Sequence, residues 1–367
     1  MNSSSRCSSS KLRILYIAYP LLPLSEHSAG GAEQVLWTLE RTMHARGHST
    51  AAAACDGSHV SGELFATGAP AEQLEQFHAR EQEQSEKIVR WLRAGAASRF
   101  DFLHDMSGSF WRHGGEVPLP ILATLHLPRS LYSGIDFSSV PEQVSFHCVS
   151  ESQRTEFADL PRMLSVIRNG IALDRFPARL VPREKREYFL WLGRICEEKG
   201  THTALDVAHA AGARLIVAGT VYPFLYHQKY FAREIIPRFK RGGSRVRHID
   251  RPTFVEKVEV LANARALLIT SEINETSSIV AMEAAACGTP VIALRRGALP
   301  EVVADRLTGL LADNAEEMIA ALSRINEIDP EQCRRYAEEH YSAGRMADDY
   351  ETLYRQMLTE CSAMKQL

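Results

Sequence analysis

The stretch Glu275-Thr276-Ser277-Ser278-Ile279-Val280-Ala281-Met282-Glu283 carries two glutamates separated by seven residues, and the second stands deep inside an apolar run. The short apolar runs 265–270 and 291–294, on either side of this stretch, are typical of buried strands. Gly288 and Pro290, just before the second run, are typical of a turn that ends a helix. The segment is therefore predicted to fold as strand, loop, helix and strand, which is a unit of parallel α/β architecture.

Glu283 is predicted to lie in the middle of the helix of this unit. The helix should begin near Ser277 or Ser278, whose hydroxyls can cap its free N–H groups, and should end at Cys287, before a left-handed Gly288. The residues one turn away from Glu283 are apolar or small, so the helix offers no polar face to a solvated glutamate. A carboxylate in such surroundings needs hydrogen-bond donors, which either the protein or a ligand with several hydroxyl groups must supply.

Short apolar strands alternate with helix-length segments along the whole chain, and they fall into two series. We expect an α/β fold of two doubly wound Rossmann-like domains that face a central cleft, with further helices at the C-terminal end. Ligands bind such sheets at the carboxyl ends of the strands. The first predicted series comprises residues 12–18, 50–55, 100–104, 121–126, 144–149 and 164–167, and the second comprises 188–192, 214–218, 246–249, 266–270, 291–294 and 309–312.

A polar segment with Asn169-Gly170, Pro177 and Pro182 separates the two series and is the predicted hinge. The first ten residues include six serines and are expected to be disordered. The predicted boundaries are 11–170 for the N-terminal domain, 171–187 for the hinge, 188–341 for the C-terminal domain, and 342–367 for a final helix that can pack back on the N-terminal domain.

The bulk composition is that of an ordinary globular protein, with 367 residues, 45% hydrophobic and 24% charged. A net charge of -3 gives no support for nucleic acid as the main partner. The seven cysteines are scattered and never form a C-x-x-C pair, which favours free thiols in a reducing compartment over structural zinc. No run resembles a signal sequence or reaches a membrane-spanning length, so a cytoplasmic location is expected.

Two groups of residues follow the first strands of the two domains. Gly30-Gly31-Ala32-Glu33 opens a helix after a long loop, and its paired glycines let backbone N–H groups approach a phosphate, a sugar or an acceptor hydroxyl. A flexible loop closed by glycines is the alternative, whereas a dinucleotide fingerprint would place G-x-G-x-x-G directly after the strand. Arg194 and Lys199 offer a planar fork and a point charge, which suit a diphosphate, although surface cations are the plainer interpretation.

Histidines give weaker signals. His126 ends the predicted strand 121–126 at the edge where the cleft should be, although a lone histidine is more often structural than catalytic. The same caution applies more strongly to His104. His44 and His48 are split by the helix-ending Gly47, and no H-E-x-x-H motif occurs, so no metal site is expected.

Taken together, these features resemble the retaining nucleotide-sugar glycosyltransferases of the group 1, or family 4, type, which have the two-domain GT-B fold. The resemblance covers nearly the whole chain. Five motifs in the family's order carry it: Gly30-Gly31-Ala32-Glu33; Arg168-Asn169-Gly170-Ile171; Gly193-Arg194 with Lys199-Gly200; the two glutamates with the following Gly288-Thr289-Pro290-Val291; and Pro300-Glu301-Val302 with Thr308-Gly309-Leu310.

The resemblance implies a site for a nucleoside-diphosphate sugar, with Glu283 accepting hydrogen bonds from ribose hydroxyls and Glu275 contacting the transferred sugar. Arg194 and Lys199 would hold the diphosphate with no metal or other cofactor, helped by the helix N-terminus at Ser277, Ser278 and Ile279. His126 would lie against the donor sugar on the acceptor side, and Gly31 near phosphate or acceptor. The expected catalytic residues are thus His126, Arg194, Lys199 and Glu275, and the donor-binding residues are Gly31, Arg194, Lys199, Glu275, Ser277, Ser278, Ile279 and Glu283.

The family retains the anomeric configuration of the sugar, and the sequence shows no obvious enzymatic nucleophile. Front-face attack by the acceptor, assisted by the departing phosphate, is therefore the expected mechanism. The chain departs from the family pattern at Thr276-Ser277-Ser278, where P-F-G is usual, at Asp250-Arg251-Pro252, where a glycine is common, and at Arg296-Gly297, where Gly-Gly is frequent. These departures leave the donor sugar and the base open.

The alternatives to a transferase are a nucleotide-sugar epimerase, which would need no separate acceptor, and a partner subunit that binds a sugar nucleotide without turnover. The acceptor is open among saccharide, lipid-linked and small-molecule classes. Peripheral contact with the inner face of a membrane also stays open. A small basic cluster at Arg41, His44, Arg46 and His48 fits such contact, but it fits a solvated helix end equally well.

Overall fold

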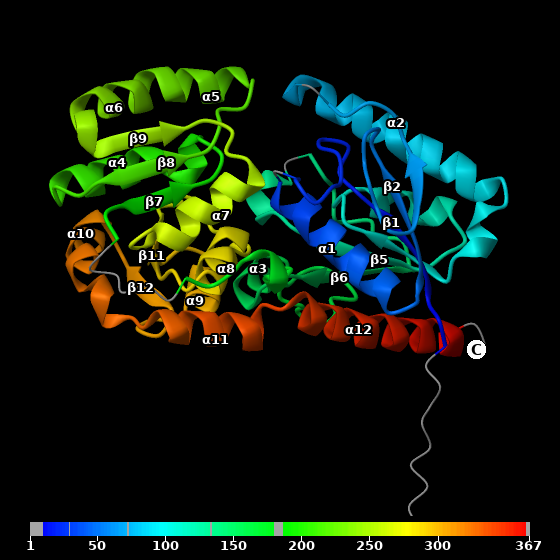
Figure 1. Ribbon diagram of the computed structural model, residues 1–367. Coiled ribbons are helices and arrows are strands. Elements are labelled where there is room, and N and C mark those ends of the chain that lie inside the picture. Colours follow the sequence, from blue (N-terminus) through cyan, green and yellow to red (C-terminus); the bar gives the residue numbers. More distant parts are fainter. Residues whose placement is uncertain (1–9, 29, 72, 133, 180–185, 365–367) are drawn as a thin grey trace, which may run out of the picture.

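Two lobes, each built around a parallel six-stranded sheet, make up the protein (Figure 1). The computed structural model describes residues 10–364 except 29, 72, 133 and 180–185. The strand order is β3-β2-β1-β4-β5-β6 in the first sheet and β12-β11-β10-β7-β8-β9 in the second, which confirms the predicted fold class. The strands are β1 Arg13–Ile17, β2 Ser49–Ala54, β3 Glu63–Ala66, β4 Phe102–Asp105, β5 Ile121–Leu125, β6 Val144–Cys148, β7 Phe189–Leu192, β8 Leu215–Ala218, β9 Val246–Ile249, β10 Leu267–Ile269, β11 Val291–Leu294 and β12 Gly309–Ala312.

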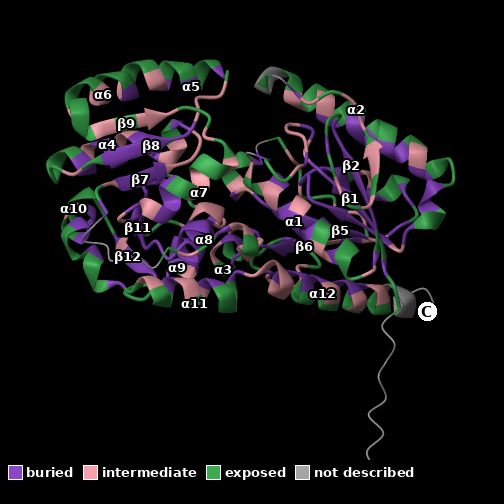
Figure 2. Cartoon of the chain, viewed as in Figure 1, coloured by how far each residue is buried: buried purple, intermediate pink, exposed green. Residues whose placement is uncertain are grey.

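Helices cover both sheets. The strands are therefore mostly buried, shown in purple in Figure 2, whereas the outer faces of the helices are exposed to solvent and shown in green. No helix of the described part of the chain combines the length and apolar character needed to cross a membrane. The helices are α1 Gly31–Ala45, α2 Leu74–Arg93, α3 Glu151–Glu156, α4 Thr201–Ala210, α5 Leu225–Tyr230, α6 Ile236–Gly242, α7 Phe254–Asn263, α8 Ile279–Ala286, α9 Leu299–Val302, α10 Ala315–Arg324, α11 Pro330–His340 and α12 Ala343–Met364.

The second series of predicted strands is confirmed throughout, but the first series needs two corrections. Residues 164–167 do not form the predicted strand; they run beside β6 through single backbone hydrogen bonds, Leu164 N to Phe146 O and Ile167 N to Cys148 O. The opposite edge of the sheet is formed by β3, which the sequence analysis missed because its side chains are only partly buried and show no clean alternation. The predicted disorder of residues 1–9, and residues 180–185 of the predicted hinge, lie outside the described residues.

The last helix, α12, crosses from the second lobe and packs under the first sheet, beside α1 (Figure 1). Its Met346, Tyr350 and Tyr354 belong to the same buried cluster as Ile14 and Leu39 of the first lobe. The hydroxyl of Tyr354 also lies 2.7 Å from Nδ1 of the fully buried His104 on β4. The sequence analysis considered His104 more often structural than catalytic. This contact with Tyr354 supports that interpretation, because the imidazole links β4 to α12.

The chain passes between the lobes twice, and the two crossing segments touch. Ile171 N donates to Tyr341 O at 2.7 Å, and Ala343 N donates to Ile171 O at 2.9 Å. A Cβ added to the neighbouring Gly170 would lie 2.7 Å from Ser342 O, which real Cβ atoms do not approach so closely. The predicted hinge is therefore hydrogen-bonded to the segment that leads into α12.

Candidate active site

A cavity of about 680 Å³ lies between the lobes, where the carboxyl ends of strands from both sheets meet. Residues from both lobes line it, as expected for ligands of doubly wound sheets. Every residue predicted for the site contributes to this lining: Gly31, His126, Arg194, Lys199, Glu275, Ser277, Ser278, Ile279 and Glu283.

Glu283 lies on α8 and is only 1% exposed, as its apolar neighbours predicted. The protein supplies one of the donors that this carboxylate needs: Lys257 Nζ, on α7, lies 2.6 Å from Glu283 Oε1. The second oxygen, Oε2, is buried and has no partner within the described residues. Glu283 therefore lines the cavity with one unsatisfied acceptor, and a hydroxyl donor that reached this oxygen would remove a substantial desolvation cost.

Glu275 lies in the loop after β10, where hydrogen bonds hold both its side chain and its backbone. Lys199 Nζ lies 2.5 Å from Glu275 Oε1, and the hydroxyl of Ser271 donates to the same oxygen. Ala298 N donates to Glu275 O at 2.7 Å, and a Cβ on Gly297 (φ 52°) would lie 2.3 Å from that carbonyl oxygen. The glycine of Arg296-Gly297 is thus needed for the backbone to pass beside Glu275.

Arg194 and Lys199 lie on the tight loop that follows β7. Gly200 closes this loop in a left-handed conformation (φ 62°), and a Cβ there would lie 1.9 Å from Thr270 O at the end of β10. The guanidinium of Arg194 lies 5.4 Å from the centre of the Tyr222 ring, in the range of a cation–π contact. Its buried Nε has no partner in the described part of the chain, so Arg194 keeps donor capacity for a ligand.

The N-terminal ends of two helices lie next to each other and both line the cavity. Helix α1 begins at Gly31 and α8 at Ile279, and a Cβ placed on Gly31 would lie 3.9 Å from Ile279 Cγ1. The first N–H groups of a helix have no partner inside it and carry partial positive charge, so this arrangement favours an anion. Ser278 occupies the N-cap position of α8, but its side chain makes no capping hydrogen bond, so the predicted capping role is wrong.

Two hydrogen bonds hold the backbone of His126, and the one with Thr276 joins the two lobes. Its backbone N donates to the hydroxyl of Tyr132 at 3.0 Å, and its carbonyl accepts from the hydroxyl of Thr276 at 2.7 Å. Burial, with a smaller contribution from nearby His147, lowers the pKa of His126 to about 3. The imidazole is therefore uncharged at neutral pH.

Three residues near the cavity carry no role in the sequence analysis. Lys257 is the cation that pairs with Glu283, and nothing in the local sequence distinguishes it from a surface lysine. Arg251 lines the cavity with φ at 48°, the left-handed region that a glycine adopts most readily. Burial raises the pKa of Glu33 on α1 to about 7, against smaller lowering contributions from a backbone hydrogen bond and from Arg194 of the second lobe.

Known proteins resemble this chain in sequence and in fold. Residues 174–343 match the family model of glycosyl transferases group 1. Alpha-maltose-1-phosphate synthase of Mycolicibacterium smegmatis is 28% identical over 226 residues, which cover 54% of this chain and 58% of that protein. This chain thus spans little more than half the length of that relative.

Solved structures share the fold over nearly the whole chain. AviGT4, a glycosyltransferase involved in avilamycin A biosynthesis, superposes with a TM-score of 0.71 at 24% identity and covers 95% of this chain and 98% of its own. HepE of Anabaena, solved in complex with UDP-glucose, gives a TM-score of 0.72 at 16% identity and covers 94% and 100%. Residues 174–343 are therefore similar to the glycosyl transferases of group 1, and the chain as a whole shares the GT-B fold that its motifs predicted.

Proposed function

We propose that the protein is a glycosyltransferase that moves a sugar from a nucleoside-diphosphate sugar to an acceptor with retention of anomeric configuration. The observation that carries this proposal is the composition of the cavity between the lobes. Two glutamates are each held by a lysine, an arginine keeps free donor capacity, and the N-terminal ends of two helices lie side by side. A nucleoside-diphosphate sugar offers hydroxyl donors at both ends and a double anion between them, which matches this set of groups.

The nucleoside end of the donor is assigned to Glu283. Its partnered oxygen is fixed by Lys257, and its free Oε2 accepts from a ribose hydroxyl. The diphosphate is assigned to Arg194 and Lys199, with the N–H groups at the start of α8. These groups are in place before the leaving group gains charge, so they stabilise the departing diphosphate without reorganisation.

The sugar end is assigned to Glu275, which already accepts hydrogen bonds from Lys199 and Ser271. A carboxylate with two such partners suits binding of a sugar hydroxyl better than attack on the anomeric carbon. His126 is uncharged at neutral pH, so it serves as a neutral hydrogen-bonding group beside the sugar and not as a general acid. Both points favour front-face attack by the acceptor hydroxyl, whose proton passes to the departing phosphate.

A screen of nucleotide sugars for slow donor hydrolysis tests this proposal without an acceptor. The full chain is incubated with UDP-, GDP- and ADP-hexoses, and the released nucleotide is measured. One donor should be hydrolysed, and Lys199→Ala should reduce the rate at least about tenfold because one cation leaves the diphosphate site.

The matched control for this variant is Lys240→Ala, which removes a lysine from α6 outside the cavity lining. Nuclear magnetic resonance of the sugar released first should show the donor's own anomer. Release of the opposite anomer would refute retention. Conversion of the donor to a free isomeric nucleotide sugar would instead establish the epimerase alternative.

A further inference from the structure

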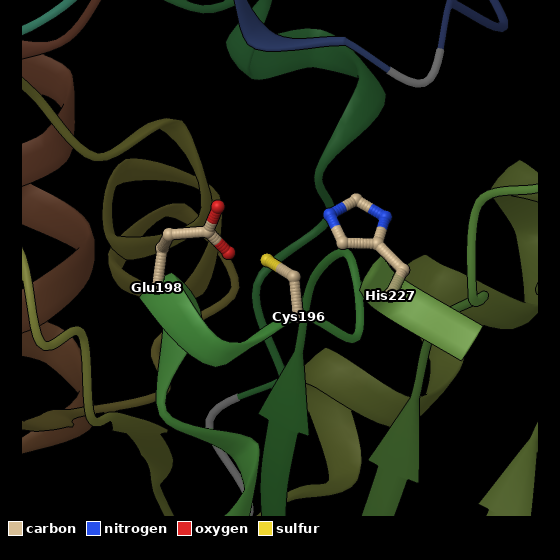
Figure 3. A group of neighbouring side chains, drawn as sticks. All are labelled: Cys196, Glu198 and His227. Atoms are coloured by element: carbon tan, nitrogen blue, oxygen red, sulfur yellow. The ribbon is translucent and has the colours of Figure 1, made fainter. Parts of the chain in front are cut away.

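A cysteine, a glutamate and a histidine converge behind the loop that carries Arg194 and Lys199. Cys196 and Glu198 lie on that loop and His227 lies on α5, and their ligand atoms all fall within 4.8 Å of one another. Figure 3 shows the sulfur of Cys196 between the carboxylate of Glu198 and the ring of His227. None of the three lines the cavity between the lobes, so the cluster is separate from the donor site described above.

His227 is the most unusual member of this cluster. Its side chain is 0% exposed, and neither Nδ1 nor Nε2 has a hydrogen-bond partner within the described residues. The rings of Tyr226 and Phe224 pack against it, with centroids 4.1 and 5.2 Å away, so the pocket is shaped for an imidazole but offers it no polar partner. Buried imidazoles without partners are costly, and a ligand that accepts a nitrogen lone pair would remove that cost.

The other two groups also have capacity left for a ligand. Glu198 Oε2 is buried and unpartnered in the described part of the chain. The thiol of Cys196 is 0% exposed, with Sγ 3.5 Å from Arg194 O, and the side chains of Arg194 and Glu198 also lie in hydrogen-bonding range of it. Thiolate, imidazole and carboxylate together form the ligand set that zinc prefers, whereas magnesium and calcium prefer oxygen alone.

We propose that Cys196, Glu198 and His227 bind one Zn²⁺ ion, with a water molecule as the fourth ligand. On binding, the thiol of Cys196 releases its proton to solvent and the thiolate sulfur forms the bond to zinc. Zinc holds its ligands about 2.0 to 2.3 Å away, so two ligand atoms can be at most about 4.6 Å apart, and small side-chain movements complete the site.

The charge of the filled site is compatible with the nearby arginine. The thiolate and the carboxylate together carry two negative charges, which equal the charge of the ion. A filled site is therefore neutral, and it adds no repulsion to Arg194. The ion ties the loop between β7 and α4 to helix α5, and so it fixes the backbone from which Arg194 and Lys199 project.

Zinc binding by the full chain tests the proposal. Protein stripped with a chelator and dialysed is titrated with Zn²⁺ in a calorimeter, in buffers of different ionisation enthalpy. The parent should bind one ion per chain and release about one proton from the thiol. Cys196→Ser and His227→Gln should each weaken binding at least about tenfold. Mg²⁺ should give no comparable heat.

Matched controls are Cys55→Ser, which removes another buried free thiol, and His209→Gln, which removes an exposed histidine. Both should keep the parent's affinity. The Co²⁺ complex of the parent should show thiolate-to-metal charge-transfer absorption, and Cys196→Ser should lose it. Zinc should raise the melting temperature of the parent more than that of Cys196→Ser.

Two results would overturn the proposal. One is a parent protein that shows no thiolate band with Co²⁺ and no stoichiometric zinc binding. The other is a folded Cys196→Ser variant that binds zinc as tightly as the parent. If Cys196→Ser fails to fold, the charge-transfer band of the parent and the behaviour of His227→Gln decide the matter.

Discussion

The sharpest prediction concerns the free oxygen of Glu283. In Glu283→Gln, the amide carbonyl can still accept from Lys257, which in the parent lies 2.6 Å from Oε1. The amide NH₂ then replaces Oε2 and meets the ribose hydroxyl as a donor, so the charged hydrogen bond is lost. Such a bond contributes about 1.5 to 3 kcal/mol, which corresponds to roughly 10- to 150-fold in Kd.

Lys257 loses its anionic partner in this variant and can itself attract the diphosphate, so the affinity for a single ligand is ambiguous. A cycle of two proteins and two ligands removes this ambiguity. Kd is measured by calorimetry for whichever of UDP, GDP or ADP binds the parent, and for its 2′,3′-dideoxy analogue. The parent should prefer the natural nucleotide by the factor given above, and Glu283→Gln should lose most of that preference.

The control for this cycle is Glu316→Gln, which removes an exposed glutamate from the first turn of α10. It should keep the parent's preference for the ribose hydroxyls. An equal preference in the parent and in Glu283→Gln would refute the assignment of Glu283 to the ribose, whatever the absolute affinities.

Three further predictions follow from other residues. Gly297→Ala places a Cβ 2.3 Å from Glu275 O, and displacement of Glu275 should lower the rate of donor hydrolysis about 100-fold; an unchanged rate in the folded variant would contradict the positioning argument. For Glu33, the pKa is raised from 4.5 to about 7 by burial, so folding favours the protonated form, and this contribution to stability is lost as pH rises. The unfolding free energy of the parent, relative to Glu33→Gln, should therefore fall by up to about 3 kcal/mol between pH 4.5 and 7; denaturant titrations at each pH measure the difference, and a flat difference would rule out the buried carboxyl. Tyr354→Phe removes the hydroxyl 2.7 Å from the buried His104 Nδ1 and should lower the unfolding free energy by about 1 to 3 kcal/mol. An unchanged unfolding free energy in denaturant titration would contradict a stabilising role for this hydrogen bond.

The sequence predicted the second lobe more fully than the first because most of its strands, β9 excepted, are short apolar runs that are buried on both faces. The edge strand β3 has only partly buried side chains, so its pattern resembles a loop. The apolar residues 164–167 show the opposite error. Their hydrophobicity reflects packing of Leu164 and Ile167 beside α12 and the first sheet, which does not require strand pairing.

The nine predicted site residues were accessible to sequence reasoning because eight lie in short motifs after strands and His126 directly follows a strand. Lys257 was not, because its pairing with Glu283 depends on how α7 packs beside α8. The same holds for His227, which stands 29 positions after Glu198 in the sequence and meets it only through the placement of α5. Contacts of this kind are set by tertiary packing, and no local spacing encodes them.

The hydrogen-bonded pair of crossings between the lobes has a mechanical consequence. A single connecting segment would leave one lobe free to bend and to twist relative to the other. Two segments joined at Ile171, through Tyr341 and Ala343, oppose torsion and leave rotation about one axis as the soft motion. We expect the lobes to open and close along one repeatable arc, so that a sugar carried by the second lobe arrives at the first in the same orientation in every cycle.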